Sequence, residues 1–389
     1  MGNRRQGQQQ HDSKAAAAQK RRKKRPAGSA KAKQKAAAKA PGTIPRVQLT
    51  DQLEVSKVIR GCWQLDGQHR GDQLSDRTSG AAAIEDLDAF SRAGMSTLDT
   101  ADIYGPSEAI VGQYMRLNPA AAMRTKVLTK LSFMAPPDAS DLRLENIEYR
   151  VRSSIARLGV TTLDLVQLHW EPPQQAPGPS GRPGVQGFVA AAKALQQLQQ
   201  RGLIGAVGVS NFDQRMLMAL LDAGVKPVSN QVSYSVMDRR PSLFLARFCE
   251  GHGIPLLAYG TLAGGLLSER YLDVPANMVR IDTVSKARYG TLLKQLGGWS
   301  WLQDLLRVLH DVGGKHGVSA SCVAARWVLQ QPGVAAVVLG ARNATHIRDA
   351  QRLFSFELDE IDSLDIDAAY EGAHQPTTDV YTWERGGSW

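Results

Sequence analysis

Cysteine is scarce in this chain of 389 residues, which holds three, at positions 62, 249 and 322. Their wide separation gives neither a disulfide framework nor the close spacing of a metal site, and it suits a protein that folds in reducing surroundings. No run of about 20 uncharged apolar residues occurs, so the sequence predicts no membrane-spanning helix. A Gly-x-Gly-x-x-Gly turn is missing after every early strand-like run, which argues against a doubly wound α/β sheet.

Acidic residues are almost absent from the first 46 positions, where Asp12 accompanies 14 Lys or Arg residues. The rest of the chain has 33 basic and 36 acidic residues, so the formal net charge of +10 belongs to the N-terminal segment. Residues 1–46 also have almost no large apolar side chains, and such a segment cannot bury enough surface to offset its ordering entropy. We therefore expect a disordered basic tail over 1–46. Because the excess positive charge lies in this tail, the net charge does not indicate that the whole protein binds nucleic acid.

The tail contains the basic run Lys-Arg-Arg-Lys-Lys-Arg-Pro at residues 20–26. Such a run is typical of a nuclear localisation signal, whereas few acids and many alanines also suit a plastid transit peptide. A solvated tail that carries no targeting signal is the third alternative. The sequence therefore leaves the compartment open between cytoplasm, plastid and nucleus.

From residue 55 onward, short apolar runs alternate with amphipathic stretches. The runs expected to be strands are 55–65, 95–102, 126–131, 163–170, 204–211, 227–234, 255–259 and 334–341. Apolar residues at helical spacing predict helices over 142–158, 185–203, 213–223 and 243–252, each with a glycine at or just past its end that suits a left-handed cap. Eight alternations of strand and helix match a (β/α)8 barrel in count and length. We expect this domain over 47–370, with a long insert at 260–300 and a C-terminal tail at 371–389.

Polar side chains of complementary chemistry follow successive predicted strands. Asp99 and Tyr104 come at the end of the second run, Lys130 near the end of the third and His169 near the end of the fourth. Because active groups in such a barrel come from the C-terminal ends of strands, these four are expected to converge over one mouth. A Lys ammonium beside a Tyr lowers the pKa of the phenol, which makes it a usable proton donor. His169 is then expected to orient a carbonyl group by hydrogen bonding.

The motifs around these residues resemble those of the aldo-keto reductase superfamily over about residues 50–370. They are Leu98-Asp99-Thr100-Ala101-Asp102-Ile103-Tyr104-Gly105, Thr129-Lys130, Leu168-His169-Trp170, Gly208-Val209-Ser210-Asn211-Phe212 and Asn230-Gln231. The resemblance implies a (β/α)8 barrel that reduces aldehydes and ketones to alcohols with NAD(P)H, or performs the reverse oxidation. It also implies a catalytic tetrad in which Tyr104 is the acid/base and Lys130 tunes it. Asp99 is then the partner of Lys130, and His169 orients the substrate.

The same resemblance assigns residues to an NADP(H) or NAD(H) cofactor. Ser210, Asn211 and Gln231 match residues that hold the nicotinamide carboxamide. Tyr259 matches the aromatic residue on which the ring stacks, with a plain core aromatic as the alternative. Further matches are Leu262, Gly264, Leu266 and Arg270 along the pyrophosphate, and Arg342, His346 and Asp349 at the adenosine end. Arg342 favours NADPH, whereas His346 stands where many relatives have Arg or Gln, so NADH remains an alternative.

The sequence does not name the carbonyl substrate, because pocket loops vary freely on this fold. Trp63 and Trp170 are expected to line the pocket. The C-terminal tail, with Tyr381, Trp383 and Trp389, is expected either to close the pocket or to pack outside the barrel. Carbonyl reduction is the favoured function. The alternatives are a redox-sensing, cofactor-binding subunit of a membrane channel and a nuclear protein whose tail binds nucleic acid nonspecifically.

Overall fold

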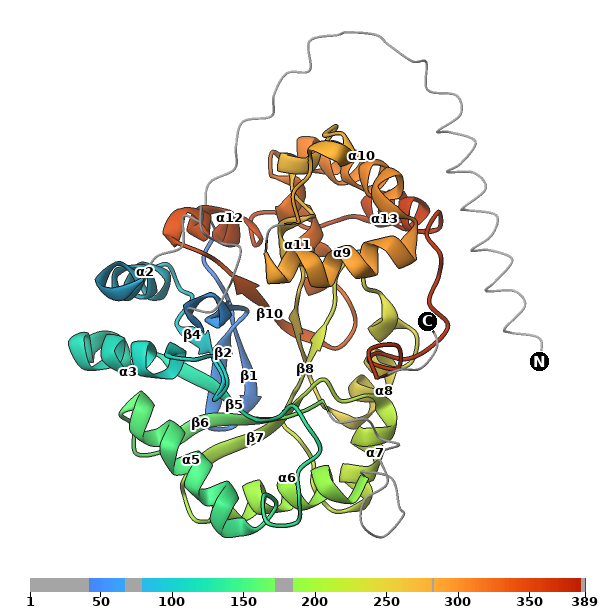
Figure 1. Ribbon diagram of the computed structural model, residues 1–389. Coiled ribbons are helices and arrows are strands. Elements are labelled where there is room, and N and C mark those ends of the chain that lie inside the picture. Colours follow the sequence, from blue (N-terminus) through green and yellow to red (C-terminus); the bar gives the residue numbers. More distant parts are fainter. Residues whose placement is uncertain (1–41, 67–78, 172–184, 282, 386–388) are drawn as a thin grey trace, which may run out of the picture.

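The computed structural model describes residues 42–66, 79–171, 185–281, 283–385 and 389. Its centre is a closed barrel of parallel strands in the order β10-β3-β4-β5-β6-β7-β8-β9 (Figure 1). These strands are β3 (Val58–Gly61), β4 (Thr97–Asp99), β5 (Lys126–Phe133), β6 (Leu163–Trp170), β7 (Ile204–Ser210), β8 (Asn230–Ser233), β9 (Leu256–Tyr259) and β10 (Val334–Gly340). Each overlaps one of the predicted runs, so the (β/α)8 barrel is confirmed.

Helices surround the barrel on all sides (Figure 1). They are α2 (Gly80–Arg92), α3 (Ser107–Leu117), α4 (Pro119–Ala122), α5 (Leu144–Leu158), α6 (Val185–Gln200), α7 (Gln214–Asp222), α8 (Leu245–His252), α9 (Val284–Leu296), α10 (Gly298–His316), α11 (Ala320–Leu329), α12 (Ile347–Arg352) and α13 (Glu360–Tyr370). Short 3-10 turns are η1 (Trp63–Asp66), η2 (Arg240–Ser242), η3 (Ala263–Gly265), η4 (Glu269–Tyr271), η5 (Ala276–Met278) and η6 (Ala344–His346). The helices predicted from apolar spacing appear as α5 to α8. Gly159 and Gly253 cap α5 and α8 with φ of 69° and 61°, as their sequence positions predict.

An antiparallel hairpin of β1 (Arg46–Thr50) and β2 (Leu53–Ser56) precedes the barrel. Leu53 and Val55 of β2 pack with side chains of the barrel interior, including Ile59, Leu165 and Leu257. The run predicted as one strand over 55–65 is therefore divided into the end of β2, the strand β3 and the turn η1. The hairpin fills the end of the barrel where the strands begin, which leaves the C-terminal ends of the strands for ligands.

The described chain enters the fold before the predicted boundary at residue 46. Ile44 is 4% exposed and belongs to the same core cluster as Phe90. Arg46 donates hydrogen bonds to Glu54 and Ser96. Residues 42–46 are therefore part of the folded body, and the rest of the predicted tail, with its basic run at 20–26, lies outside the described residues.

Two truncations test where the tail ends. Deleting residues 1–41 is expected to leave the melting temperature unchanged, because that segment offers almost no apolar side chains to pack. Deleting residues 1–46 also removes the buried Ile44, which is expected to lower the free energy of unfolding by about 2–5 kcal/mol. Thermal and urea unfolding of both proteins beside the full chain measure the difference. A clear loss of stability in the shorter deletion would contradict the expectation that 1–41 is an independent tail.

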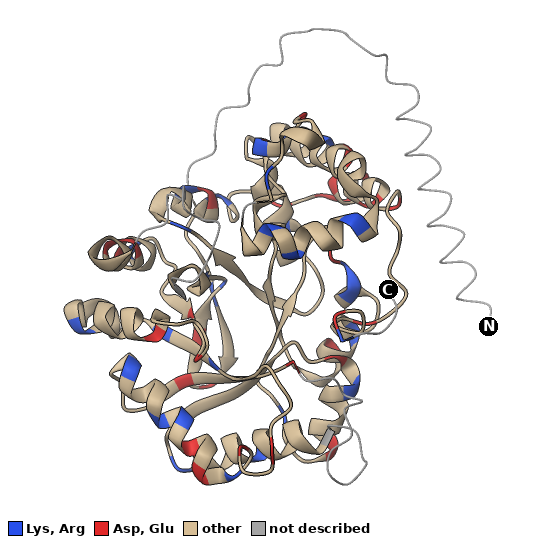
Figure 2. Cartoon of the chain, viewed as in Figure 1, with Lys and Arg blue, Asp and Glu red and all other residues tan. Residues whose placement is uncertain are grey.

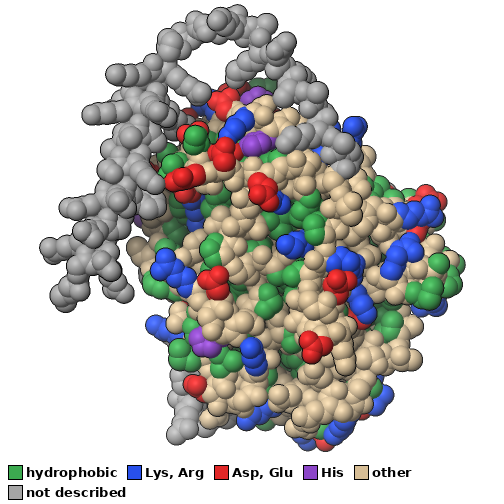
Figure 3. Space-filling view, turned by 180° about the vertical axis from the view of Figure 1, so that it is seen from behind, with side chains coloured by type: hydrophobic (Ala, Val, Ile, Leu, Met, Phe, Trp, Pro, Cys, Tyr) green, Lys and Arg blue, Asp and Glu red, His purple; other side chains and the backbone are tan. Residues whose placement is uncertain are grey.

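Charged residues of both signs lie mainly on the outer helices (Figure 2). On the face shown in Figure 3, basic and acidic side chains are interspersed without an extended basic surface. All three cysteines lie within the described ranges and are buried and unpaired. Every described helix falls short of the length and apolarity that crossing a membrane requires.

Candidate active site

The C-terminal ends of β4, β5 and β6 bring the predicted tetrad to one end of the barrel. Asp99 is the last residue of β4, Tyr104 lies in the turn before α3, and Lys130 and His169 lie in β5 and β6. Asp99 and Lys130 form an ion pair with 2.6 Å between Oδ1 and Nζ, and their side chains are only 4% and 3% exposed. A pair this deeply buried is costly unless further hydrogen bonds satisfy both partners.

Those further hydrogen bonds are present. The second oxygen of Asp99, Oδ2, accepts hydrogen bonds from Gln167 Nε2 at 3.0 Å and from Gln231 Nε2 at 2.6 Å. Lys130 Nζ also donates to the backbone oxygen of Thr100 at 2.9 Å. Gln167 was not predicted, because it lies inside an apolar strand and belongs to no motif. Gln231 was predicted, and its nitrogen is used by Asp99, which leaves its side-chain oxygen to accept from a ligand amide.

Lys130 also lies against the face of Tyr104, with Nζ 5.0 Å from the ring centroid. Burial alone would lower the pKa of Lys130, but Asp99 and Tyr104 raise that pKa above its ordinary value, so the side chain remains an ammonium. Burial raises the pKa of Tyr104, while the charge and hydrogen bond of Lys130 act in the opposite direction. The predicted lowering by Lys130 is therefore present, but desolvation outweighs it, so the pKa of Tyr104 lies above its ordinary value. The phenol stays protonated at neutral pH, as a proton donor must.

A carboxylate that was not predicted lies beside His169. Glu171 Oε1 is 3.1 Å from His169 Nε2 and accepts a hydrogen bond from Asn211 Nδ2 at 2.9 Å. The hydrogen bond with His169 lowers the pKa of Glu171 to about 2 against the opposing effect of burial. Because an ionised carboxylate only accepts hydrogen bonds, Nε2 of His169 carries a proton. His169 Nδ1 lies 3.1 Å from Ser210 Oγ, which holds the other side of the ring.

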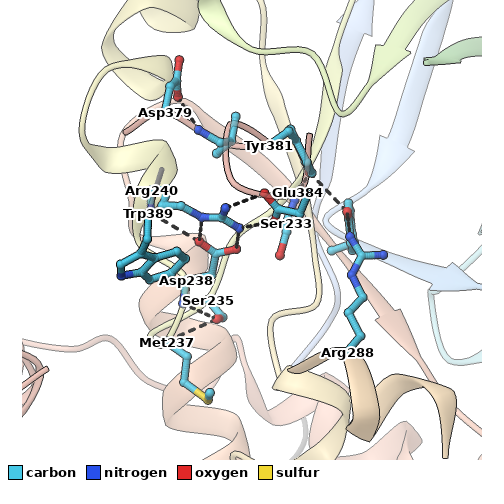
Figure 4. Close-up of polar contacts among 12 residues, drawn as sticks. Ser233, Ser235, Met237, Asp238, Arg240, Arg288, Asp379, Tyr381, Glu384 and Trp389 are labelled. Carbon is cyan, nitrogen blue, oxygen red and sulfur yellow. Dashed lines mark hydrogen bonds and ion pairs between the residues drawn. The ribbon is translucent and has the colours of Figure 1, made fainter. Parts of the chain in front are cut away.

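The hydroxyl of Tyr259, at the end of β9, joins three other elements. It donates to Asn211 Oδ1 at 3.0 Å, accepts from Arg288 of α9 at 3.0 Å and lies 3.2 Å from the hydroxyl of Tyr381. Tyr381 is 2% exposed and accepts a hydrogen bond from the backbone N–H of Ser233 at 2.9 Å (Figure 4). The C-terminal tail is thus connected to two residues predicted to hold the nicotinamide.

Charged side chains anchor the same tail to the barrel. Arg240 is 2% exposed and donates to both oxygens of Asp238, at 2.8 and 2.9 Å. It also donates to both oxygens of Glu384 in the tail, at 2.7 and 2.6 Å (Figure 4). Arg385 donates to the backbone oxygens of Trp170 and Asn211, at 3.2 and 2.8 Å. The tail is therefore fixed to the ends of β6 and β7 as well as to η2.

The aromatic residues of the tail divide between the two predicted positions. Tyr381 lies at the mouth of the barrel. Trp383 and Trp389 pack edge to face with centroids 5.5 Å apart, and the ring of Trp389 lies 5.2 Å from the Arg240 guanidinium. These two tryptophans therefore pack around the anchor on the outside.

Trp170 does not line the mouth, contrary to the prediction. Side chains alternate along a strand, so the neighbour of the inward-facing His169 points toward the helices. Trp170 is 2% exposed and packs against Phe133 and against Phe188 of α6. Trp63 lies in η1 after β3 and is partly buried, and its place in a substrate pocket stays a prediction.

Helix α9, in the insert after β9, packs against the glycine-rich stretch that was predicted to face the pyrophosphate. Gly264 has a φ of 66°, and a Cβ there would press on Ser285 and Tyr289 of α9. A Cβ at Gly260 would collide with the Tyr289 hydroxyl, so α9 approaches this closely only because glycine stands there. The side chain of Leu266 is wholly buried, which leaves only its backbone to face a ligand.

A pocket of ≈ 220 Å³ opens within the same insert. Its lining residues are Arg270, Tyr271, Val274, Met278, Val279, Arg280 and Lys286. Arg270 was predicted at a pyrophosphate, and Arg280 and Lys286 were not. Three cationic side chains around one pocket are a donor set that suits phosphate groups.

The segment predicted at the adenosine end follows β10. Arg342 precedes η6, and His346 at the end of η6 is exposed. Asp349 lies in the next helix, α12, with a half-exposed side chain. Asp86 of α2, which was not predicted, accepts a hydrogen bond from the backbone N–H of Ala344 at 3.0 Å. A carboxylate therefore lies at the turn that was predicted to hold the adenosine end of the cofactor.

Comparisons with known proteins agree with this geometry. The model of the aldo/keto reductase family matches residues 57–371. A 6-dehydroglucose reductase of Agrobacterium fabrum is 28% identical over 79% of this chain and 91% of its own. An NADH-specific methylglyoxal reductase of Escherichia coli is 24% identical over 81% of this chain and 94% of its own. The structure of the glycerol dehydrogenase AKR11B4 from Gluconobacter oxydans superposes with a TM-score of 0.69 at 25% identity, covering 86% of this chain and 98% of that one.

Proposed function

The chain belongs to the aldo/keto reductase family, and we propose that it reduces aldehydes or ketones to alcohols with NADPH. The observation that carries the proposal is the buried Asp99–Lys130 pair against Tyr104 at the C-terminal end of the barrel. Relatives named as reductases of 6-dehydroglucose and methylglyoxal support a carbonyl substrate.

The residues present fit a nicotinamide cofactor. Ser210, Asn211 and Gln231 would hold the carboxamide, and Gln231 has its side-chain oxygen available for this purpose. Tyr259 would lie against the ring. The phosphates would be held by Arg270, Arg280 and Lys286, and the adenosine end by Arg342, His346 and Asp349, with the backbone of Leu262, Gly264 and Leu266 between them. The bound cofactor supplies the hydride.

The residues of the chain supply the proton that the alkoxide needs and stabilise the group that loses it. Tyr104 donates the proton of its hydroxyl to the oxygen of the developing alkoxide. The ammonium of Lys130 stabilises the phenolate that this step leaves, and Asp99 holds Lys130 in place. His169, which carries its proton on Nε2, donates a hydrogen bond to the carbonyl oxygen and so orients the substrate.

A screen of NADPH consumption over a panel of aldehydes and ketones tests this proposal. Turnover of several carbonyl compounds at rates ordinary for an enzyme, about 1–1000 per second, is expected. Tight NADPH binding with very slow turnover of the whole panel would instead favour a redox-sensing, cofactor-binding subunit.

Replacing Arg342 tests the preference for NADPH. Only NADPH carries the 2′-phosphate that Arg342 can pair with, so Arg342→Ala is expected to weaken NADPH binding and leave NADH binding unchanged. We expect a change of about 2- to 10-fold, because a pair near the surface contributes little and Asp86 lies at the same turn. Fluorescence titration with both cofactors measures the two affinities, and Arg348→Ala in α12 is the matched control. Equal losses for both cofactors would contradict the assignment of Arg342.

A further inference from the structure

Glu171 is an anionic side chain in contact with two groups that the proposed reaction uses. Its Oε1 atom lies 3.1 Å from His169 Nε2 and 2.9 Å from Asn211 Nδ2. We propose that Glu171 determines substrate specificity: it selects carbonyl compounds with a hydroxyl group next to the carbonyl and rejects those with a carboxylate there. The inference rests on the proposed function, since it concerns the substrate of the same site.

Glu171 accepts from two hydrogen-bond donors, His169 Nε2 and Asn211 Nδ2. In the proposed reaction, His169 Nε2 donates its hydrogen bond to the carbonyl oxygen of the substrate instead of to Glu171. The nicotinamide carboxamide likewise competes with Glu171 for the hydrogen bond that the Asn211 amide donates. The side chain of Glu171 is 30% exposed in the free protein. When substrate and cofactor bind, Glu171 loses these hydrogen bonds and also becomes less accessible to water. A carboxylate that loses its hydrogen bonds in a partly buried site is destabilising, so a replacement donor on the substrate improves binding.

A hydroxyl on the neighbouring carbon is such a donor. Glu171 Oε1 lies 3.1 Å from the Nε2 atom to which the carbonyl oxygen binds, so the carboxylate and the carbonyl group lie next to each other. A hydroxyl one carbon from the carbonyl therefore reaches the carboxylate, whereas a plain alkyl group leaves it without a partner. A site built to accept a hydrogen bond from a substrate discriminates strongly against analogues that lack the donor.

A substrate carboxylate at the same position meets a like charge. Lys130 and Arg288 are cationic groups near the same mouth. Lys130 is paired with Asp99, whereas Arg288 donates to the neutral hydroxyl of Tyr259 and keeps its positive charge. Among the described charged side chains, Glu171 is the one in contact with His169, and Coulomb interactions weaken with distance. A substrate carboxylate held beside His169 therefore meets the charge of Glu171 directly, and we expect this repulsion to exceed the attraction by Arg288.

The test compares Glu171→Gln with the unchanged enzyme. Glutamine keeps the length of the side chain and an oxygen that accepts from His169 and Asn211, so the variant removes the charge with little change of shape. The matched control is Glu250→Gln, which removes an exposed carboxylate near the end of α8. Thermal unfolding and NADPH titration establish that both variants fold and bind the cofactor.

Three small aldehydes supply the readout: glyceraldehyde with a neighbouring hydroxyl, propanal without one, and glyoxylate with a carboxylate. For the unchanged enzyme, kcat/KM is expected to fall in that order. Glu171→Gln is expected to lower the glyceraldehyde/propanal ratio and to raise the glyoxylate/propanal ratio, each by about 10- to 100-fold. Ratios cancel any general loss of activity, so a merely structural role of Glu171 does not change them.

Two outcomes separate this inference from the proposed function. If the unchanged enzyme reduces the aldehydes and Glu171→Gln has the same ratios, the inference is wrong and the proposed function stands. If the unchanged enzyme reduces no carbonyl compound, the proposed function is wrong, and binding then decides the inference. The melting temperature of both proteins is measured with glycerol and with glycolate. A smaller glycerol shift and a larger glycolate shift in the variant support the role of Glu171, and identical shifts contradict it.

Discussion

Replacing Tyr104 by phenylalanine is expected to lower kcat for carbonyl reduction by about 100- to 10,000-fold, the usual contribution of positioned proton transfer. Phenylalanine keeps the ring that lies beside Lys130 and removes only the hydroxyl whose proton the alkoxide needs. NADPH binding is expected to remain, because the hydroxyl of Tyr104 is not among the groups assigned to the cofactor. Steady-state rates and fluorescence titration of NADPH measure the two effects separately.

Tyr114→Phe is the matched control for this change. Tyr114 is wholly buried in α3, and its hydroxyl has no hydrogen-bond partner among the described residues. Tyr114→Phe therefore removes the same kind of atom at a position that the proposed reaction does not use. A Tyr104→Phe protein that binds NADPH and keeps most of its activity would contradict the proposed proton donor. The family and the fold would stand in that case, since neither depends on this hydroxyl.

The sequence predicted the tetrad because each of its residues lies at the end of a strand-like run in a recognisable motif. Glu171 lies two residues after His169, yet nothing in the sequence places its side chain against Asn211, 40 residues further along the chain. Gln167 has the same limitation, because only closure of the barrel brings it to Asp99. Such contacts depend on the register between strands, which local patterns do not specify.

The same distinction applies to the fold. The strands that close the barrel were predictable because apolar runs bounded by helices leave few alternatives. Strand β1 was not predicted, and the last two residues of β2 were merged into the first barrel strand, because Val55 continues the apolar pattern of β3. Helix α9 had a usable signal in the helical spacing of Tyr289, Leu292, Leu293 and Leu296, all of which are buried. The position of the tail follows from long-range ion pairs, and no periodic pattern encodes those.

The second large effect is expected from Arg240, the residue that holds the C-terminal tail. Arg240→Met is expected to lower the free energy of unfolding by about 3–5 kcal/mol, because removing one partner of a buried ion pair leaves the other charge unpaired. Asp238 is that charge, with a side chain only 1% exposed. Glu384, which is 26% exposed, reaches water more easily and contributes less to the loss.

Urea unfolding measures this loss against Arg201→Met, which breaks an exposed ion pair with Glu148 and is expected to cost about 0–1 kcal/mol. If the unpaired charge is the cause, adding Asp238→Leu to Arg240→Met restores most of the stability, because an apolar pair can replace a buried ionic one. A double variant no more stable than Arg240→Met alone would instead assign the loss to release of the tail. The NADPH affinity of the double variant then gives the consequence of that release, because the tail reaches Tyr259 through Tyr381.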